Sequence, residues 1–174
     1  KRILFGISLR LGTYAADRKL DKGFHDPLAK IIDFITWNIS FRSITKKLGI
    51  SKVDIAASGA APIAPEVLKF FMALGVPIFE GYGMTENTGY ATGNDYDNIQ
   101  LGTVGIPNKE CELKLADDGE ILIRHGAVFK GYFKDDKATR ETIDEDGWLH
   151  TGDVGEMHGR FVKIVDRKKD IIIT

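Results

Sequence analysis

The segment KVDIAASGAAPIAPEVLKFFMALGVPIFEG, residues 52–81, decides the predicted fold. Residues 52–62 begin as a short apolar strand and turn into a loop of small residues, whereas residues 64–75 have the apolar spacing of an amphipathic helix. Pro65 suits the first helical position, and Gly75 suits the position just after the last turn. A second apolar strand, VPIFEG, completes the segment. The order strand, loop, helix, strand predicts an α/β unit with a parallel sheet.

Two helical stretches precede this unit. Apolar residues recur at helical spacing over residues 1–20 and again over residues 26–48. Asp26 followed by Pro27 is typical of a helix start, with the acid as N-cap and the proline at the first helical position. We therefore expect an α/β portion that spans residues 1–98.

The character of the chain changes after residue 100. Short segments in which apolar and polar residues alternate follow, and turn residues separate them. KLADDGEILI is typical of a hairpin, because Asp118 and Gly119 lie between two alternating runs. A short helix is expected at DDKATRETI. These features predict a β-rich, barrel-like subdomain over residues 99–166.

The composition excludes several classes of protein. The net charge is -1, so no global field would attract nucleic acid. Cys111 is the only cysteine, which rules out an internal disulfide and favours a reducing compartment such as the cytoplasm. The four histidines show no metal-ligand spacing, and no apolar run approaches the roughly 20 residues needed to span a bilayer.

Both ends suggest a segment of a longer protein. The first residues, KRILFGISLRLG, contain no initiator methionine and do not have the layout of a signal peptide. The last residues, VKIVDRKKDIIIT, stop inside an apolar run that resembles a strand. We interpret the sequence as a central fragment, which would be catalytically inactive alone.

Two glycine-containing loops follow the predicted strands, SGAAP at residues 58–62 and GYGMTE at residues 81–86. In open α/β sheets, ligands lie beyond the carboxyl ends of the strands. Thr85 offers a hydroxyl to a phosphate oxygen, and Glu86 offers a carboxylate suited to Mg²⁺ shared with phosphates. Tyr82 offers an aromatic face for a base. Together they predict a nucleotide site.

Simpler interpretations compete with this one. Each glycine loop taken alone is more often a tight turn than a ligand site. GYGMTE is no dinucleotide fingerprint, because Glu86 stands where the third glycine belongs, and residues 94–102 lack the central glycine of a calcium loop. The acidic segment DEDG at residues 144–147 is expected to form a turn, and the basic residues 167–169 would by themselves be a solvated face.

Several motifs in one order resemble the adenylate-forming superfamily of acyl-CoA synthetases, luciferase-like enzymes and peptide-synthetase adenylation domains. They are SGAAPIAPEVLKFF (58–71), GYGMTE (81–86), GTVGIP (102–107), GWLHTGD (147–153) and DRKKD (166–170). The resemblance implies that the chain is part of the large N-terminal domain. The helical residues 1–48 look most like the long-chain fatty acyl-CoA synthetase branch. Residues 167–174, with Lys169, would form the hinge towards a C-terminal domain that the chain does not contain.

The resemblance also implies site residues. Tyr82 would stack on the adenine, Thr85 would contact the α-phosphate and Glu86 would bind Mg²⁺, so Thr85 and Glu86 form the catalytic pair. Asp153 would accept hydrogen bonds from the ribose hydroxyls, and Arg167 would reach the ribose or a phosphate. The nucleotide-binding set comprises Gly59, Ala60, Ala61, Pro62, Glu80, Gly81, Tyr82, Gly83, Thr85, Asp153 and Arg167. Trp148 and residues 128–132 are expected only to pack the β-rich part.

The implied activity is ATP-dependent activation of a carboxylic acid, most like a long-chain fatty acid, through an acyl-adenylate that is then transferred to CoA. ATP, Mg²⁺ and CoA would take part. Adenylation of an aryl, short-chain or amino acid stays open, as does a degenerate homologue that only holds a nucleotide or acyl chain. A structural fragment without a ligand fits the ends but not the polar constellation. Oligomeric state and peripheral contact with the inner face of a membrane are also left open.

Overall fold

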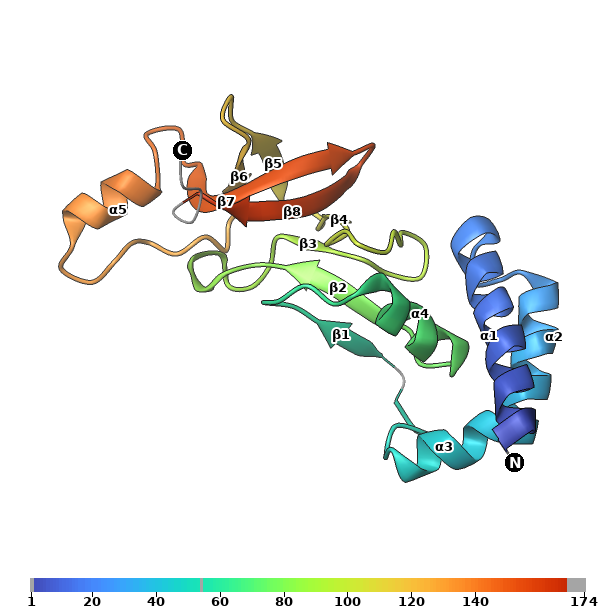
Figure 1. The fold of residues 1–174 in the computed structure, drawn as a ribbon. Helices are drawn as coiled ribbons and strands as arrows, with labels where there is room; N and C mark the ends of the chain where they lie inside the picture. The colour runs from blue at the N-terminus through green and yellow to red at the C-terminus, as the bar shows by residue number, and fades with distance from the viewer. Residues whose placement is uncertain (1, 54, 169–174) are drawn as a thin grey trace, which may run out of the picture. The chain divides into compact units, whose positions relative to one another are not determined.

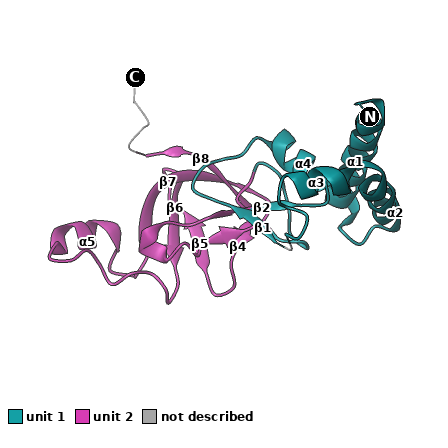
Figure 2. Ribbon diagram, turned by 90° about the horizontal axis from the view of Figure 1, so that it is seen from below, with its two compact units in different colours: residues 1–79, 95–102 teal, residues 80–94, 103–174 magenta. Residues whose placement is uncertain are grey.

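The computed structural model describes residues 2–53 and 55–168 (Figure 1). The chain divides into two compact units (Figure 2). Unit 1 contains residues 1–79 and 95–102, and unit 2 contains residues 80–94 and 103–174.

Unit 1 begins with helices, as the apolar spacing predicts. They are α1 (Arg2–Lys22), α2 (Pro27–Thr36) and α3 (Arg42–Lys47). Between α2 and α3 the helix widens into a π-helical turn, η1 (Trp37–Phe41), which the periodicity does not reveal. Figure 1 shows α1 and α2 side by side.

The start of α2 confirms the predicted cap. Asp26 Oδ2 accepts a hydrogen bond from Ala29 N at 2.8 Å, and Pro27 occupies the first turn. Arg18 on α1 binds both carboxylate oxygens of Asp26 at 2.7 Å. One aspartate therefore begins α2 and also ties it to α1.

Small residues bring α1 against its neighbours within unit 1. A Cβ on Gly12 would lie 2.9 Å from the Phe41 ring and 3.0 Å from the carbonyl oxygen of Ala73. Ala15 and Ala16 on the same face of α1 are fully buried. The close approach therefore requires glycine and alanine along this face.

The predicted strand–helix–strand unit is confirmed as β1 (Ala56–Ser58), α4 (Pro65–Ala73) and β2 (Ile78–Tyr82). Gly75 ends α4 with φ +82°, the left-handed conformation that glycine tolerates best. Strand β2 starts in unit 1 and ends in unit 2. It ends within the GYGMTE motif.

The first sheet has the strand order β1–β2–β3–β4. The two added strands, β3 (Thr92–Gly93) and β4 (Ile106–Pro107), have two residues each. The β2–β3 and β3–β4 pairs are antiparallel. The parallel pairing that the sequence suggested concerns β1 and β2, which are neighbours in this sheet, and it stays a prediction. Two-residue strands are too short to show an alternating pattern, so the sequence did not predict them.

The β-rich half is confirmed as an antiparallel sheet in the order β5–β6–β7–β8. Its strands are β5 (Glu112–Leu115), β6 (Glu120–Arg124), β7 (Leu149–His158) and β8 (Phe161–Arg167), and the predicted short helix is α5 (Asp136–Thr142). Figure 1 shows β7 and β8 as a long hairpin. Val104 N donates to Val162 O and Val162 N donates to Gly105 O, each at 2.8 Å, and these bonds join β8 to the segment before β4. The core of unit 2 contains Ala91, Cys111, Ile121, Ile123, Leu149 and Val162.

Apolar side chains are also exposed along α1 and α2, including Ile3, Ile7, Ile31 and Phe34. Across residues 2–53 and 55–168, no helix has both the length and the apolar character needed to cross a membrane. Peripheral contact with a membrane, which the sequence left open, is not tested by this finding.

Candidate functional site

The sequence predicted GYGMTE as a loop, but Gly81 and Tyr82 are the last residues of β2, and the chain folds back on itself only after them. A Cβ on Gly83 would lie 2.3 Å from the carbonyl carbon of Gly89, so position 83 accepts only glycine without a shift of the backbone. Gly89 N donates to Met84 O at 2.9 Å and closes the loop. The sequence suggested that these glycines admit a ligand, but the atoms that approach Gly83 belong to the loop itself.

A short 3₁₀ turn, η2 (Thr85–Asn87), carries the two predicted catalytic residues. Asn87 is fully buried, and its Oδ1 accepts a hydrogen bond from Met84 N at 2.8 Å. Thr85 is exposed and Glu86 is half-buried. Asn87 therefore fixes the turn while the two preceding side chains stay accessible. Sequence reasoning missed Asn87, because the residue at the N-cap position is Met84 and not the Ser or Thr of the usual capping-box pattern.

Glu86 is held by a segment far away in the sequence. Its Oε1 accepts a hydrogen bond from the Tyr132 hydroxyl at 2.7 Å, and its carbonyl oxygen accepts one from Phe129 N at 2.7 Å. The bond to Glu86 raises the pKa of the Tyr132 phenol above its usual value. The expectation that residues 128–132 only pack the β-rich part is therefore incomplete, because two of them bind Glu86. No spacing signal links positions that lie 46 residues apart.

Three of the predicted nucleotide-binding residues meet in unit 2. The Tyr82 hydroxyl donates to Asp153 Oδ2 at 2.5 Å, and Arg167 Nε donates to Asp153 Oδ1 at 3.1 Å. The Asp153 side chain is only 9% exposed, whereas that of Arg167 is 72% exposed. Burial, and then the bond to Asp153, raise the pKa of Tyr82 far above its usual value, so the phenol stays a neutral donor.

The conformation of β7 places Asp153 for this contact. Thr151 Oγ1 donates to Ile121 O at 2.8 Å and accepts a hydrogen bond from Asp153 N at 3.2 Å. Gly152 has φ +71°, and its N–H donates to Glu120 Oε1 at 2.8 Å. The TGD residues thus form an irregular part of strand β7. Their side-chain and backbone hydrogen bonds orient the carboxylate of Asp153.

A second polar cluster lies at the predicted DRKKD motif. Lys168 Nζ contacts Asp118 Oδ2 at 2.6 Å and Glu120 Oε2 at 3.0 Å. Glu120 is buried and also contacts His150 Nδ1 at 3.2 Å. Lys168 is exposed, as a solvated basic face would be, but its ammonium is also paired with two carboxylates. It joins the end of β8 to the β5–β6 hairpin, a role that the sequence did not show.

The remaining predicted positions differ in their surroundings. Glu80 is buried, and Gly81 pairs with Gly93 in the β2–β3 ladder. Residues 59–62 belong to unit 1, whereas the Tyr82–Asp153–Arg167 group belongs to unit 2. Lys169, the predicted hinge residue, lies outside the described residues.

The donors around Glu86 fit a cation that is shared with phosphates. Within residues 2–53 and 55–168, no group of three or more His, Cys, Asp or Glu side chains could hold a metal ion by itself. Glu86 Oε2 accepts no hydrogen bond from this part of the chain, and the preceding residue, Thr85, is exposed. Magnesium is usually bound by one or two protein carboxylates together with substrate phosphates and water. The few oxygen ligands that the chain offers here would suit it.

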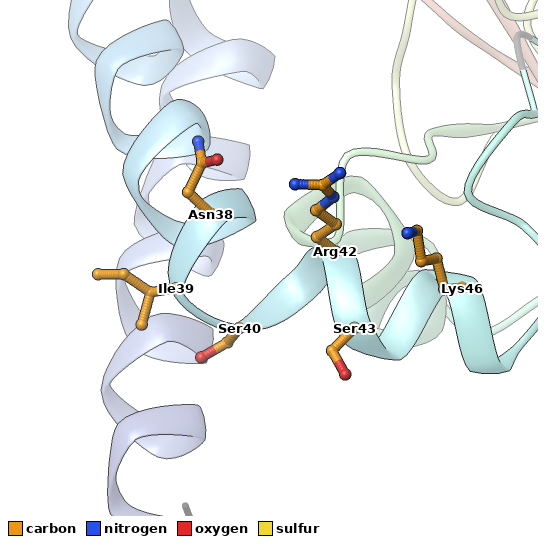
Figure 3. Close-up of a pocket in the computed structure, with 6 residues that line it drawn as sticks. All are labelled: Asn38, Ile39, Ser40, Arg42, Ser43 and Lys46. Carbon is orange, nitrogen blue, oxygen red and sulfur yellow. The ribbon is translucent and has the colours of Figure 1, made fainter.

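A hollow of about 280 Å³ lies along η1 and α3 in unit 1 (Figure 3). Its lining comes from one continuous helical segment and consists of Asn38, Ile39, Ser40, Arg42, Ser43 and Lys46. None of the site residues predicted from the sequence lines it. The hollow is a surface groove beside one helix rather than the predicted nucleotide site.

Comparison with protein families gives a match over most of the chain. The family model described as AMP-binding enzyme matches residues 23–133. The chain is 44% identical over 147 residues to the peroxisomal long chain acyl-CoA synthetase 6 of Arabidopsis thaliana, covering 75% of this chain and 21% of that protein. It is 44% identical over 144 residues to long-chain-fatty-acid–CoA ligase 5 of Mus musculus, with the same coverage of 75% and 21%. The chain thus spans about a fifth of the length of these relatives.

Solved structures agree with this match. A fatty acyl CoA synthetase of Mycobacterium tuberculosis superposes with a TM-score of 0.65 at 26% identity, over 82% of this chain and 30% of that chain. The anthranilate CoA ligase AuaEII, solved in complex with anthranoyl-AMP, superposes with a TM-score of 0.66 at 26% identity, over 71% and 26%. These similarities confirm the predicted fold class, a partial α/β layer followed by a β-rich subdomain of an adenylate-forming N-terminal domain.

Proposed function

The chain belongs to the AMP-binding enzyme family, and from this premise we propose that it is the central part of an AMP-forming long-chain fatty acid–CoA ligase. The named relatives are synthetases or ligases of this class, and the chain covers 21% of each. The observation that carries the proposal is the buried Asp153 carboxylate, which joins Tyr82 and Arg167 in one polar group. Such a group offers a carboxylate to ribose hydroxyls and an aromatic ring to a base.

The proposed reaction has two steps. A carboxylate oxygen of the fatty acid attacks the α-phosphorus of ATP, and the bond to pyrophosphate breaks to give an acyl-adenylate. The sulfur of CoA then attacks the acyl carbon, its proton is released, and AMP leaves with the bonding electrons. ATP, the fatty acid and CoA are the small-molecule substrates. The protein contributes mainly by positioning these groups and neutralising their charge.

Thr85 and Glu86 would act at the phosphates. The exposed Thr85 hydroxyl can donate a hydrogen bond to the α-phosphate. Glu86 would hold Mg²⁺, which when bound neutralises negative charge on the phosphate oxygens. The turn η2 presents both side chains together, because Asn87 holds it from within.

Tyr82 and Asp153 would act at the nucleoside. The hydroxyl of Tyr82 is engaged by Asp153, so the face of the ring is the part available for the adenine. Each carboxylate oxygen of Asp153 has a second lone pair for a ribose hydroxyl. Arg167, which is largely exposed, can reach the ribose or a phosphate. The family resemblance also assigns residues 59–62, Glu80, Gly81 and Gly83 to nucleotide binding.

The proposal is tested by ATP–pyrophosphate exchange in the full-length protein, with palmitate, acetate, benzoate or mixed amino acids. Exchange that depends on palmitate supports both the adenylation step and the fatty-acid substrate. Exchange with another acid keeps the reaction and changes the substrate. If no acid supports exchange, the chain belongs to a protein that only binds nucleotide or acyl groups.

The role of Glu86 is tested in the same assay. Glu86→Gln should lower exchange by orders of magnitude without lowering thermal stability, because it removes the charge but keeps the shape. Glu145→Gln, which removes an exposed carboxylate in the 144–147 turn, is the matched control and should retain full exchange. Unchanged exchange in Glu86→Gln would remove Glu86 from the mechanism.

A further inference from the structure

Residues 129–132 contact Glu86 at two separate points. Phe129 N donates to the backbone carbonyl of Glu86, and the Tyr132 hydroxyl donates to its side-chain Oε1, each at 2.7 Å. The first contact holds the turn η2 in place. The second restricts the rotation of the carboxylate itself. The two contacts are chemically independent, so a variant can remove one and keep the other.

Tyr132 is itself held by a folded segment. Its N–H donates to Thr139 Oγ1 at 2.9 Å, and its ring packs edge-on against Phe129 with centroids 4.9 Å apart. Gly131 has φ +140°, and a Cβ there would lie 2.6 Å from Thr139 Cγ2. Thr139 belongs to α5, which Asp135 caps at 2.9 Å. A tyrosine fixed at its backbone and its ring can orient a partner at its hydroxyl.

We infer that Tyr132 is a positioning residue for Glu86 in metal-dependent adenylation, an inference that rests on the proposed function. By donating to Oε1, the Tyr132 hydroxyl leaves Oε2 as the carboxylate oxygen for a cation. Hydrogen bonds from an outer residue to a metal-binding carboxylate fix its orientation and typically change metal affinity by about 10- to 100-fold. Tyr132 would touch neither substrate nor metal and would act only through Glu86.

The variant Tyr132→Phe isolates this effect. It removes the hydroxyl and keeps the ring against Phe129 and the backbone bond from Phe129 to Glu86. In the full-length protein, the Mg²⁺ concentration that half-saturates palmitate-dependent exchange should rise about tenfold. The rate at saturating Mg²⁺ and the thermal stability should change little. Tyr90→Phe, which removes an exposed hydroxyl bonded to Lys109 O, is the matched control and should match the wild type.

A binding measurement gives a readout that does not depend on turnover. Mn²⁺ serves as the probe, and its free concentration is followed by electron paramagnetic resonance in the presence of a non-hydrolysable ATP analogue. Tyr132→Phe should weaken Mn²⁺ binding about tenfold, and Glu86→Gln should weaken it further. In the Glu86→Gln background, adding Tyr132→Phe should have no further effect, because the hydroxyl acts through the carboxylate.

The outcomes separate the two proposals. Failure of the wild-type protein to exchange pyrophosphate with any acid overturns the proposed function, whatever the Mn²⁺ affinities are. With exchange intact, wild-type Mn²⁺ affinity in Tyr132→Phe overturns the positioning role. The positioning role is also overturned if Tyr132→Phe lowers Mn²⁺ affinity equally in the wild type and in Glu86→Gln, since Tyr132 would then act independently of Glu86. A loss of stability with no change in Mn²⁺ affinity would assign Tyr132 a purely structural role.

Discussion

The hydroxyl of Tyr82 donates a hydrogen bond to Asp153 Oδ2 at 2.5 Å, although 71 residues separate the two in the chain. Arg167 holds the other oxygen of the same carboxylate at 3.1 Å. The contact joins the end of β2 to β7, so the proposed platform for the base and the proposed acceptor for the ribose are hydrogen-bonded to each other. A disturbance of either residue should therefore affect the other.

Tyr82→Phe should destabilise the protein and weaken its affinity for ATP. The change leaves Asp153 Oδ2 without its donor in a buried position, which typically costs about 1–3 kcal/mol of the free energy of unfolding. The KM for ATP should rise, because the carboxylate loses one of the contacts that orient it. Denaturant unfolding and exchange kinetics measure the two effects. Tyr90→Phe, with an exposed hydroxyl, should stay within about 0.5 kcal/mol of the wild type.

Gly83→Ala should distort the loop that carries Thr85 and Glu86. The added Cβ would lie 2.3 Å from the carbonyl carbon of Gly89, so the backbone must move, at a cost of about 1–3 kcal/mol. A shift of about 1 Å at Glu86 can lower the rate on the order of 100-fold. Exchange rate and thermal unfolding check the prediction.

Gly126→Ala is the matched control for this loop variant, because a Cβ there meets no atom within 4 Å. It should leave both exchange rate and stability unchanged. If Gly83→Ala behaves like Gly126→Ala, the loop has more freedom than the approach of Gly83 to Gly89 implies.

The stability of unit 1 should depend on pH through the ionisation of Asp26. Hydrogen bonds from Arg18, and then from Ala29 N, lower the pKa of Asp26 to about 2, below the value of about 3.9 in unfolded chains. The pKa of Asp26 is lower in the folded chain than in the unfolded chain. Ionised Asp26 therefore contributes fully to the free energy of unfolding above its unfolded pKa, and this contribution is lost as the pH falls towards 2.

This acid dependence can be measured by thermal unfolding between about pH 6 and pH 2. Asp26→Asn should be less stable at neutral pH and should lack the part of the acid-induced loss that Asp26 causes. Asp21→Asn, at an exposed position on α1, should keep the wild-type profile. A wild-type profile in Asp26→Asn would mean that its ion pair with Arg18 does not contribute to folding.

Cys111 should be unreactive in the folded chain. Burial, and then the charge of Glu112, raise the pKa of its thiol to about 11. Because the thiolate is the reactive form, Ellman's reagent at pH 8 should modify native Cys111 at least about 100-fold more slowly than Cys111 in guanidinium. Since it is the only cysteine in the 174-residue chain, the rate belongs to it alone. Similar rates in both conditions would show that the core around β5 opens readily.

The local elements and the family could be predicted from the sequence. Asp26 and Pro27 at the start of α2, and Gly75 after α4, lie where the sequence predicts them. So do the β5–β6 hairpin and α5. A cap, a helix end or a tight turn depends on residues a few positions apart, so its signal lies within a short window. The motif order also indicated the fold class and nominated Tyr82, Thr85, Glu86, Asp153 and Arg167.

Tertiary structure alone decided how these residues are held. Tyr132 reaches Glu86 across 46 residues, and Tyr82 reaches Asp153 across 71. Which side chains meet at such separations depends on strand register, on the irregular turn at Gly152 and on the path of the segment before α5. A change of one residue in register would turn a side chain to the other face of the sheet. The chain therefore encodes its candidate site residues locally, whereas packing selects their partners.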